Sequence, residues 1–209
     1  MNKFILGAKQ NMTQVFDENG MVHPVTLISA GPVTVTALKS KEKDGYVAIQ
    51  LGYGKRALNR LNKAERGHLS KILKDKAVGF KYLREWRSGQ DNSNLKIGDT
   101  VDLGSFAEGE VVNVAAISKG KGFQGVVKRH GFHGGPRSHG QKHSERAPGS
   151  IGAGGRQGVI KGMRMAGRMG SDRVTVRNLK VISIDKENNL MAIRGAVPGR
   201  RGSLVEIYN

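Results

Sequence analysis

Runs of alternating apolar and polar residues recur along residues 1–117 and again along residues 174–209. Residues 33–36, for example, read Val-Thr-Val-Thr, which is the period of a strand with one buried face. An Asn19-Gly20 pair between two apolar runs is typical of a hairpin turn. We predict strands at residues 4–7, 12–16, 25–28, 33–36, 46–51, 80–86, 100–103, 111–117, 174–176, 180–184, 190–193 and 204–208. Many short strands at regular spacing favour a mainly β fold, here a small β-barrel.

Residues 55–79 break the strand pattern. Apolar residues recur there with rough helical spacing among Lys, Arg, Asn and Glu, namely at Leu58, Leu61, Leu69, Ile72 and Leu73. We predict a small helical excursion, and a solvated helix of mixed charge explains it more simply than a binding element. The only tryptophan, Trp86, ends the strand predicted next. Because aromatic residues in strands usually pack inward, we expect Trp86 in the core.

Residues 118–173 lack the apolar periodicity of the rest of the chain. They hold 15 of the 30 glycines and four of the six histidines, while large apolar side chains are sparse. Such a segment buries too little surface to offset the entropy of ordering it. Since strands are predicted on both sides, we expect one body formed by residues 1–117 and 174–209. Residues 118–173 then leave the body and return as a long, irregular extension rich in Gly, Arg and Lys.

The positive charge of the chain concentrates in this extension. The formal net charge of the whole chain is +18, and residues 118–173 hold twelve Lys or Arg against two acids, Glu145 and Asp172. Cations this close together repel one another, so an ordered extension requires a polyanionic partner. No recognition helix is visible, which favours folded RNA over duplex DNA. A disordered cationic loop without a fixed partner is the alternative.

The candidate RNA-binding residues are the cations and histidines of the extension, together with an aromatic residue. Lys and Arg neutralise phosphates, glycines let the backbone approach them, and Phe123, Phe132 or His133 could stack on unpaired bases. The candidates are Lys119, Lys121, Phe123, Lys128, Arg129, His130, His133, Arg137, His139, Lys142, His143, Arg146, Arg156, Lys161, Arg164, Arg168 and Arg173.

Two other kinds of site are weighed against RNA binding. Residues 120–125 match G-x-G-x-x-G, but the short, β-branched run that follows ends at Gly131, whereas a dinucleotide site requires a helix to open at the glycines. The four histidines, His130, His133, His139 and His143, lack the spacing of known metal motifs. We therefore predict no cofactor and no metal. No nucleophile–base set is evident either, but such sets are spatial, so a nucleic-acid-processing enzyme and a free nucleic-acid chaperone stay as alternatives.

The chain also lacks features of export and membrane insertion. It has no cysteine, and its first apolar run, residues 4–6, is too short for the core of a signal peptide. No window approaches the roughly 18 apolar residues of a membrane span. We expect a cytoplasmic protein.

Four stretches of the chain resemble the bacterial type of one ribosomal family, that of the third protein of the large subunit. A long signature is matched at every defined position, at Phe106, Asn113, Ala116, Ser118, Gly120, Lys121, Gly122, Gly125 and Arg129. Residues 7–16, 146–152 and 196–199 are also similar to the family. The resemblance covers essentially the whole chain. Asn11 stands where the family usually has glycine, and the region 55–79 looks short.

The resemblance implies a fold, a partner and a role. The body would be a translation-factor-like β-barrel, and the extension would enter large-subunit ribosomal RNA beside neighbouring ribosomal proteins. The family also implies early binding during subunit assembly and no catalysis by the protein. The tip of the extension would approach the peptidyl transferase centre, and it is formed by Pro148, Gly149, Ser150, Ile151, Gly152, Ala153, Gly154, Gly155, Arg156 and Gln157. Some members carry a methylated glutamine in this tip, where our alignment places Ala153, so we expect that modification to be absent.

Overall fold

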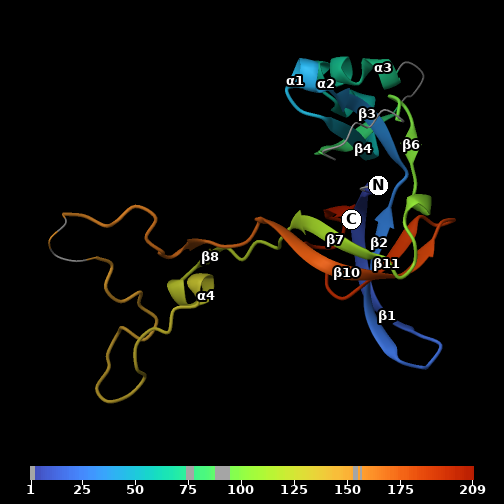
Figure 1. The fold of residues 1–209 in the computed structure, drawn as a ribbon. Coiled ribbons are helices and arrows are strands. Elements are labelled where there is room, and N and C mark those ends of the chain that lie inside the picture. The colour runs from blue at the N-terminus through green and yellow to red at the C-terminus, as the bar shows by residue number, and fades with distance from the viewer. Residues whose placement is uncertain (1–2, 74–77, 88–94, 153–154, 156) are drawn as a thin grey trace. The chain divides into compact units, whose positions relative to one another are not determined.

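The chain folds into two compact units in a computed structural model (Figure 1). The structure describes residues 3–73, 78–87, 95–152, 155 and 157–209. The first unit is Met1–Ile117 with Arg173–Asn209, and the second unit is Ser118–Asp172. The first unit is dominated by strands, and it contains a closed barrel. The predicted mainly β fold with a barrel is therefore confirmed.

Six antiparallel strands close the barrel in the order β1-β12-β7-β10-β11-β2. They are β1 (Phe4–Phe16), β2 (Val22–Ala30), β7 (Val111–Ile117), β10 (Arg173–Asp185), β11 (Leu190–Arg194) and β12 (Leu204–Tyr208). Both predicted runs at residues 4–7 and 12–16 belong to the single long strand β1. The register of β1 with β2 shifts between Lys9 and Met12, so Asn11 lies in an irregularity of the strand.

A second sheet of four strands, in the order β5-β4-β3-β6, completes the first unit. Its strands are β3 (Val33–Lys39), β4 (Ala48–Ala57), β5 (Val78–Trp86) and β6 (Thr100–Val101), and the short helices nearby in the chain are α1 (Lys41–Asp44), η1 (Leu58–Arg60), α2 (Lys63–His68), α3 (Ser70–Leu73) and η2 (Leu103–Ser105). The helical excursion predicted over 55–79 is therefore shorter and broken, because β4 runs on to Ala57 and β5 begins at Val78. Asn62 and Glu65 form a capping box that starts α2.

One apolar core joins the barrel and the second sheet. Alternate residues of the barrel strands point inward, so Ile5, Val114 and Ile207 are fully buried. The same cluster includes Val35 and Leu51 of the second sheet. This continuity makes the first unit a single folding body.

Trp86 lies where the two sheets meet and is half-buried against the core, so the expectation that it lies in the core is met only in part. Its ring stacks on Phe4, with ring centroids 4.9 Å apart, and it lies 4.9 Å from the ring of Tyr208. All three aromatic residues belong to or pack against the core cluster. The aromatic group therefore fixes the second sheet against the ends of β1 and β12.

The second unit is mostly irregular. Its regular elements are the pair β8 (Phe123–Gln124) and β9 (Gly167–Arg168) and the five-residue helix α4 (Val126–His130). Val126 is its only buried large apolar residue among those described. The low apolar content read from the sequence thus corresponds to a unit without an extended core.

The described helices were also compared with the length and apolar composition of a membrane span. Among the described residues, no helix is long and apolar enough to cross a membrane.

Candidate nucleic-acid interface

Backbone hydrogen bonds pair the two limbs of the second unit where it starts and ends. Ser118 donates to the carbonyl of Asp172 over 2.9 Å, and Lys121 donates to Met169 over 2.9 Å. Gly170 has φ +78°, and a Cβ there would overlap the carbonyl oxygen of Lys119. Glycine is therefore required at this close approach of two backbones.

A small folded node surrounds α4. The helix ends at Gly131, which takes the left-handed conformation of a C-cap with φ 72°. Arg129 Nη1 donates to the carbonyl of Met165 over 2.7 Å, and His130 Nε2 lies 3.0 Å from the same oxygen. The guanidinium of Arg164 lies 5.9 Å from the ring centroid of Phe132. These contacts hold residues 163–168 against α4, so three of the candidate RNA-binding residues also serve the internal structure of the unit.

A second local contact closes the loop between residues 134 and 146. Gly135 donates to the carbonyl of Glu145 over 2.9 Å, and Arg137 Nε donates to the Glu145 carboxylate over 2.6 Å. This is the one ion pair of the second unit among the described residues. Because Arg137 is strongly exposed, the pair is screened by water and contributes little stability.

Most described cations of the second unit have no carboxylate partner among the described residues. Seven of the predicted residues are exposed and make no side-chain hydrogen bond or ion pair with the described part of the chain: Lys119, Lys121, Lys128, Lys142, Arg146, Lys161 and Arg168. The exposed side chains of His133, His139 and His143 are likewise available, and Phe123 is 76% exposed. The second unit therefore presents free positive charge and an unburied aromatic ring together.

The predicted tip lies in an irregular loop. Pro148, Gly149, Ser150, Ile151, Gly152, Gly155 and Gln157 are all exposed. Ala153, Gly154 and Arg156 lie outside the residues that the structure describes, as does the expectation about modification at Ala153.

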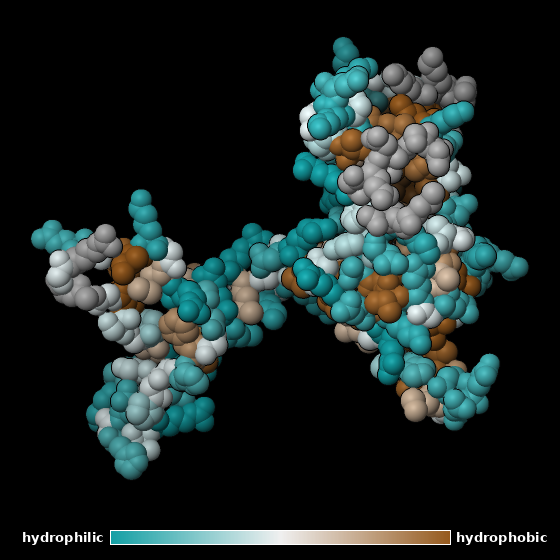
Figure 2. Space-filling model, in the orientation of Figure 1, coloured by the Kyte–Doolittle hydropathy of each residue, from teal (hydrophilic) through white to brown (hydrophobic). Residues whose placement is uncertain are grey.

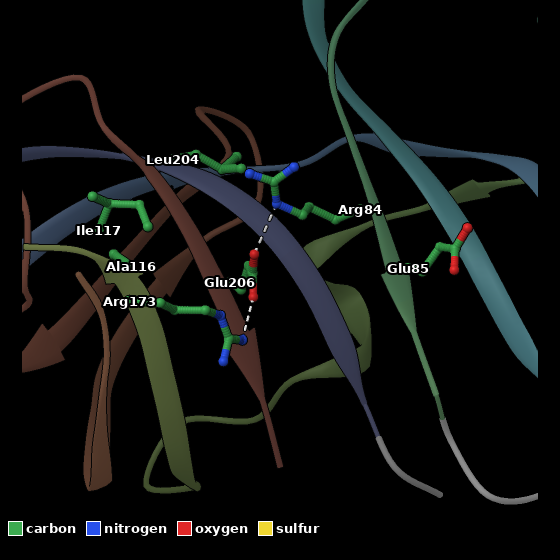
Figure 3. Close-up of a pocket in the computed structure, with 7 residues that line it drawn as sticks. All are labelled: Arg84, Glu85, Ala116, Ile117, Arg173, Leu204 and Glu206. Atoms are coloured by element: carbon green, nitrogen blue, oxygen red, sulfur yellow. Dashed lines mark hydrogen bonds and ion pairs between the residues drawn. The ribbon is translucent and has the colours of Figure 1, made fainter. Parts of the chain in front are cut away.

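Arg173, the last of the predicted residues, belongs to the first unit. It opens β10, and its Nη2 donates to Glu206 over 2.5 Å, while Arg84 Nε donates to the other oxygen of the same carboxylate over 3.0 Å (Figure 3). The hydrogen bond from Glu206 raises the pKa of the Arg173 guanidinium above its ordinary value. The three side chains lie in a pocket of about 410 Å³ that also contains Glu85. Two carboxylates there balance two guanidinium groups, so this pocket lacks the excess positive charge of the second unit.

Two other kinds of site considered from the sequence were a metal site and a dinucleotide site. Among the described residues, no group of three His, Cys, Asp or Glu side chains is arranged to hold a metal ion. The helix α4 opens after Gly125 but ends after five residues, and β7, the strand before the glycine motif, pairs antiparallel with both β10 and β12. A dinucleotide fold needs parallel strands joined through a longer helix. The G-x-G-x-x-G match therefore has no such structural context.

Sequence reasoning missed the contacts that depend on distant residues. Arg84 and Glu206 are 122 positions apart, and neither lies in the basic segment. The bonds of Arg129 and His130 to Met165 were also missed, because a backbone acceptor leaves no mark in the sequence. Local charge counts identify cations but do not separate free ones from those that hold the fold.

The chain is similar to known ribosomal proteins over nearly its full length. Residues 90–197 match the family model described as "Ribosomal protein L3". A protein of Herpetosiphon aurantiacus named "Large ribosomal subunit protein uL3" is 50% identical over 206 residues, which cover 97% of this chain and 94% of that protein. Proteins of the same name from Acidothermus cellulolyticus and Finegoldia magna are 49% and 47% identical, and the matches cover 98% of this chain in each case and 91% and 96% of the respective relatives. The chain therefore belongs to the ribosomal protein L3 family, whose members are structural proteins of the large ribosomal subunit and not enzymes.

Proposed function

We propose that the second unit binds large-subunit ribosomal RNA directly, within a chain that is a structural constituent of that subunit in the bacterial cytoplasm. The observation that carries the proposal is the set of seven exposed Lys and Arg residues without partners in the described part of the second unit. Unpaired cations at this density repel one another, and RNA phosphates would remove that repulsion while releasing counterions.

The backbone of the second unit supports the same proposal. An irregular chain with few long-range hydrogen bonds can follow a crevice of folded RNA, which is recognised by shape rather than through a groove code. Phe123, at 76% exposure, is available to stack on an unpaired base. Exposed histidines in the same unit offer hydrogen bonds to phosphate or 2′-hydroxyl groups.

We extend the proposal to place and timing on the strength of the family resemblance. The tip at residues 148–157 would approach the peptidyl transferase centre and support the RNA there. The protein would bind early in the assembly of the subunit, beside other large-subunit proteins. A basic segment that becomes ordered only on RNA is suited to early binding, since it stabilises the RNA fold that later components meet.

The first test is sedimentation of the tagged chain from a cell lysate, with crosslinking to identify bound RNA. Comigration with large subunits and crosslinks from residues 118–172 to their RNA are expected. A chain that crosslinks to many unrelated RNAs with little preference would favour the chaperone alternative and overturn the proposal.

The second test measures the salt dependence of RNA binding. Replacing Lys121, Lys128, Lys142 and Lys161 with Gln should reduce the slope of log K against log salt by roughly 0.7–0.9 for each phosphate that is no longer neutralised. A control variant removes the same charge from exposed lysines of the first unit, namely Lys41, Lys63, Lys96 and Lys186. An equal reduction in both variants would mean that net charge, and not the second unit, carries the binding.

A further inference from the structure

The end of the β1–β2 hairpin is a two-stranded ribbon, defined here as residues 10–24. Within it, residues 12–16 of β1 pair only with β2, and residues 22–24 of β2 pair only with β1, among the described strands. The neighbours β12 and β11 pair with other parts of these strands, at residues 4–8 of β1 and 25–29 of β2. Figure 1 shows this hairpin continuing beyond the other barrel strands. A ribbon of two strands is only marginally stable by itself, so a covering partner would stabilise it.

One face of the ribbon exposes large apolar side chains. Phe16 and Val22 are direct register partners and so share a face, and Met12 lies on the same face four residues before Phe16. Met12 is 49%, Phe16 61% and Val22 47% exposed, and Met21 in the turn is 61% exposed. Figure 2 shows hydrophobic colouring along this hairpin. Clustered apolar exposure of this kind marks an interaction surface.

The surface beside these side chains is wide and open. Met12, Thr13, Gln14, Val22 and Pro24 line a shallow, nearly flat depression there. The lining mixes apolar and polar side chains and contains no charged group. An open face of this kind suits the broad surface of another protein rather than a small ligand, which needs a concave site.

The charge of the ribbon is opposite to that of the whole molecule. Residues 10–38 contain no Lys or Arg, although the chain has 35 in 209 residues. The turn carries two carboxylates, Asp17 and Glu18. Asp17 accepts hydrogen bonds from the backbone N–H groups of Met21 and Asn19 over 2.8 Å and 3.0 Å, and its side chain lies 3.3 Å from His23 Nε2. The bond from Met21 contributes most to lowering the pKa of Asp17, so this carboxylate is ionised at neutral pH.

The exposed apolar side chains and the two carboxylates favour one kind of binding partner for the ribbon. RNA phosphates would meet two carboxylates and no cation, and a second copy of the ribbon would bring like charges together. Other proteins held on the same RNA carry excess Lys and Arg for the reason that this chain does. We infer that the ribbon docks on a basic surface of a second large-subunit protein, with Met12, Phe16 and Val22 against an apolar patch and Asp17 and Glu18 against Lys or Arg. The inference rests on membership of the large subunit and not on RNA binding by the second unit.

The test places a photoreactive phenylalanine analogue at position 16 of the full-length tagged chain, with a parallel chain labelled at position 123. Both are produced in the protein's own cells, and assembled large subunits are isolated through the tag and irradiated. The expected product at position 16 is a protein–protein crosslink that survives ribonuclease, with the partner peptide rich in Lys or Arg. An RNA crosslink, a crosslink to a second copy, an acidic partner peptide, or no crosslink at position 16 would overturn the inference. If the chain labelled at position 123 forms no crosslink to RNA, that result would instead count against the proposed function.

A charge variant tests the electrostatic part of the inference without disturbing the turn. The Glu18 side chain makes no hydrogen bond or ion pair with the described residues, so Glu18→Lys leaves the bonds of Asp17 intact. We expect Glu18→Lys to lower the crosslink yield from position 16 by about 1.4- to fivefold, since each exposed charge pair contributes little to binding. Glu18→Gln, as the matched control, should have a smaller effect. An unchanged crosslink yield with Glu18→Lys would mean that the carboxylates do not contact the partner, and it would overturn the inference of a basic partner.

Discussion

The two units of this protein differ in how much of their surface they bury and in how many of their charges are paired. The first unit closes its barrel, so each barrel strand is paired on both sides, and it buries residues such as Ile5 and Ile207 completely. The second unit buries little, and seven of its cations lack partners among the described residues. The comparison teaches that one chain can carry a fold specified by a buried core next to a segment whose exposed charge, as we propose, is neutralised by a partner. Stability and binding should therefore respond to different substitutions.

The largest expected effect is a core deletion in the first unit. Ile207→Ala removes a fully buried side chain whose strand neighbours are Ile5 and Val114. We expect the free energy of unfolding, measured by urea denaturation, to fall by about 2–5 kcal/mol. The matched control is Ile160→Ala in the second unit, where the side chain is 52% exposed and the loss should stay within about 0.5 kcal/mol. Equal losses would contradict the division between the two units.

A smaller effect is expected where the sheets of the first unit are joined by charge. Glu206→Gln weakens the bonds to Arg84 and Arg173, whose side chains are about half exposed. Water screens both pairs, so we expect a loss of about 1 kcal/mol in the free energy of unfolding, and less at high salt. Glu187→Gln, in the exposed turn after β10, is the control and should change little. A loss from Glu206→Gln that does not depend on salt would show that packing, and not charge, joins the sheets there.

Removing the tip should scarcely affect the first unit. When residues 148–157 are replaced by two glycines, the midpoint of thermal unfolding should stay within a few degrees of that of the full chain, because the described tip residues are exposed and contribute no core. RNA crosslinking near the peptidyl transferase centre should be lost in the same variant. A large fall in the unfolding midpoint would mean that the tip packs against the rest of the chain.

The smallest effect concerns pH and tests the paired charges of the first unit. Burial opposes the ionisation of Glu110, but hydrogen bonds from Lys3, the backbone of Ala107 and Asn209 outweigh it and lower its pKa below the usual 4.5. A carboxylate with a lowered folded pKa stabilises the fold above its unfolded pKa, and this contribution is lost as the pH falls through the folded value. Glu110→Gln should therefore destabilise the protein at pH 6 and have less effect near pH 3, as urea denaturation at the two pH values would measure. An effect of equal size at both values would exclude ionisation as its cause.

Much of the fold follows from patterns that are local in the sequence. Short apolar runs predict β7, β11 and β12, of which β12 alternates buried with half-buried residues, and the lack of such runs marks the second unit. What could not be predicted depends on partners far away in the chain. The helical spacing near Leu58 suggested a longer helix, but pairing with β5 extends β4 to Ala57. Composition assigns Arg173 to the basic segment. Pairing with β7 instead places Arg173 in the barrel, where its guanidinium donates a hydrogen bond to Glu206.

The register of β7 with β10 sets the cost of changing the length of the second unit. Ile117 and Arg173 are direct partners, so the barrel meets the intervening 55 residues as a hairpin connection whose two ends are already joined. For a flexible connection of this kind, each doubling of length adds only about 0.6 kcal/mol of closure entropy. Insertions and deletions in the second unit thus cost the barrel little folding free energy, so the length of this unit can be set by its proposed binding partner while the barrel evolves under the separate demand of folding.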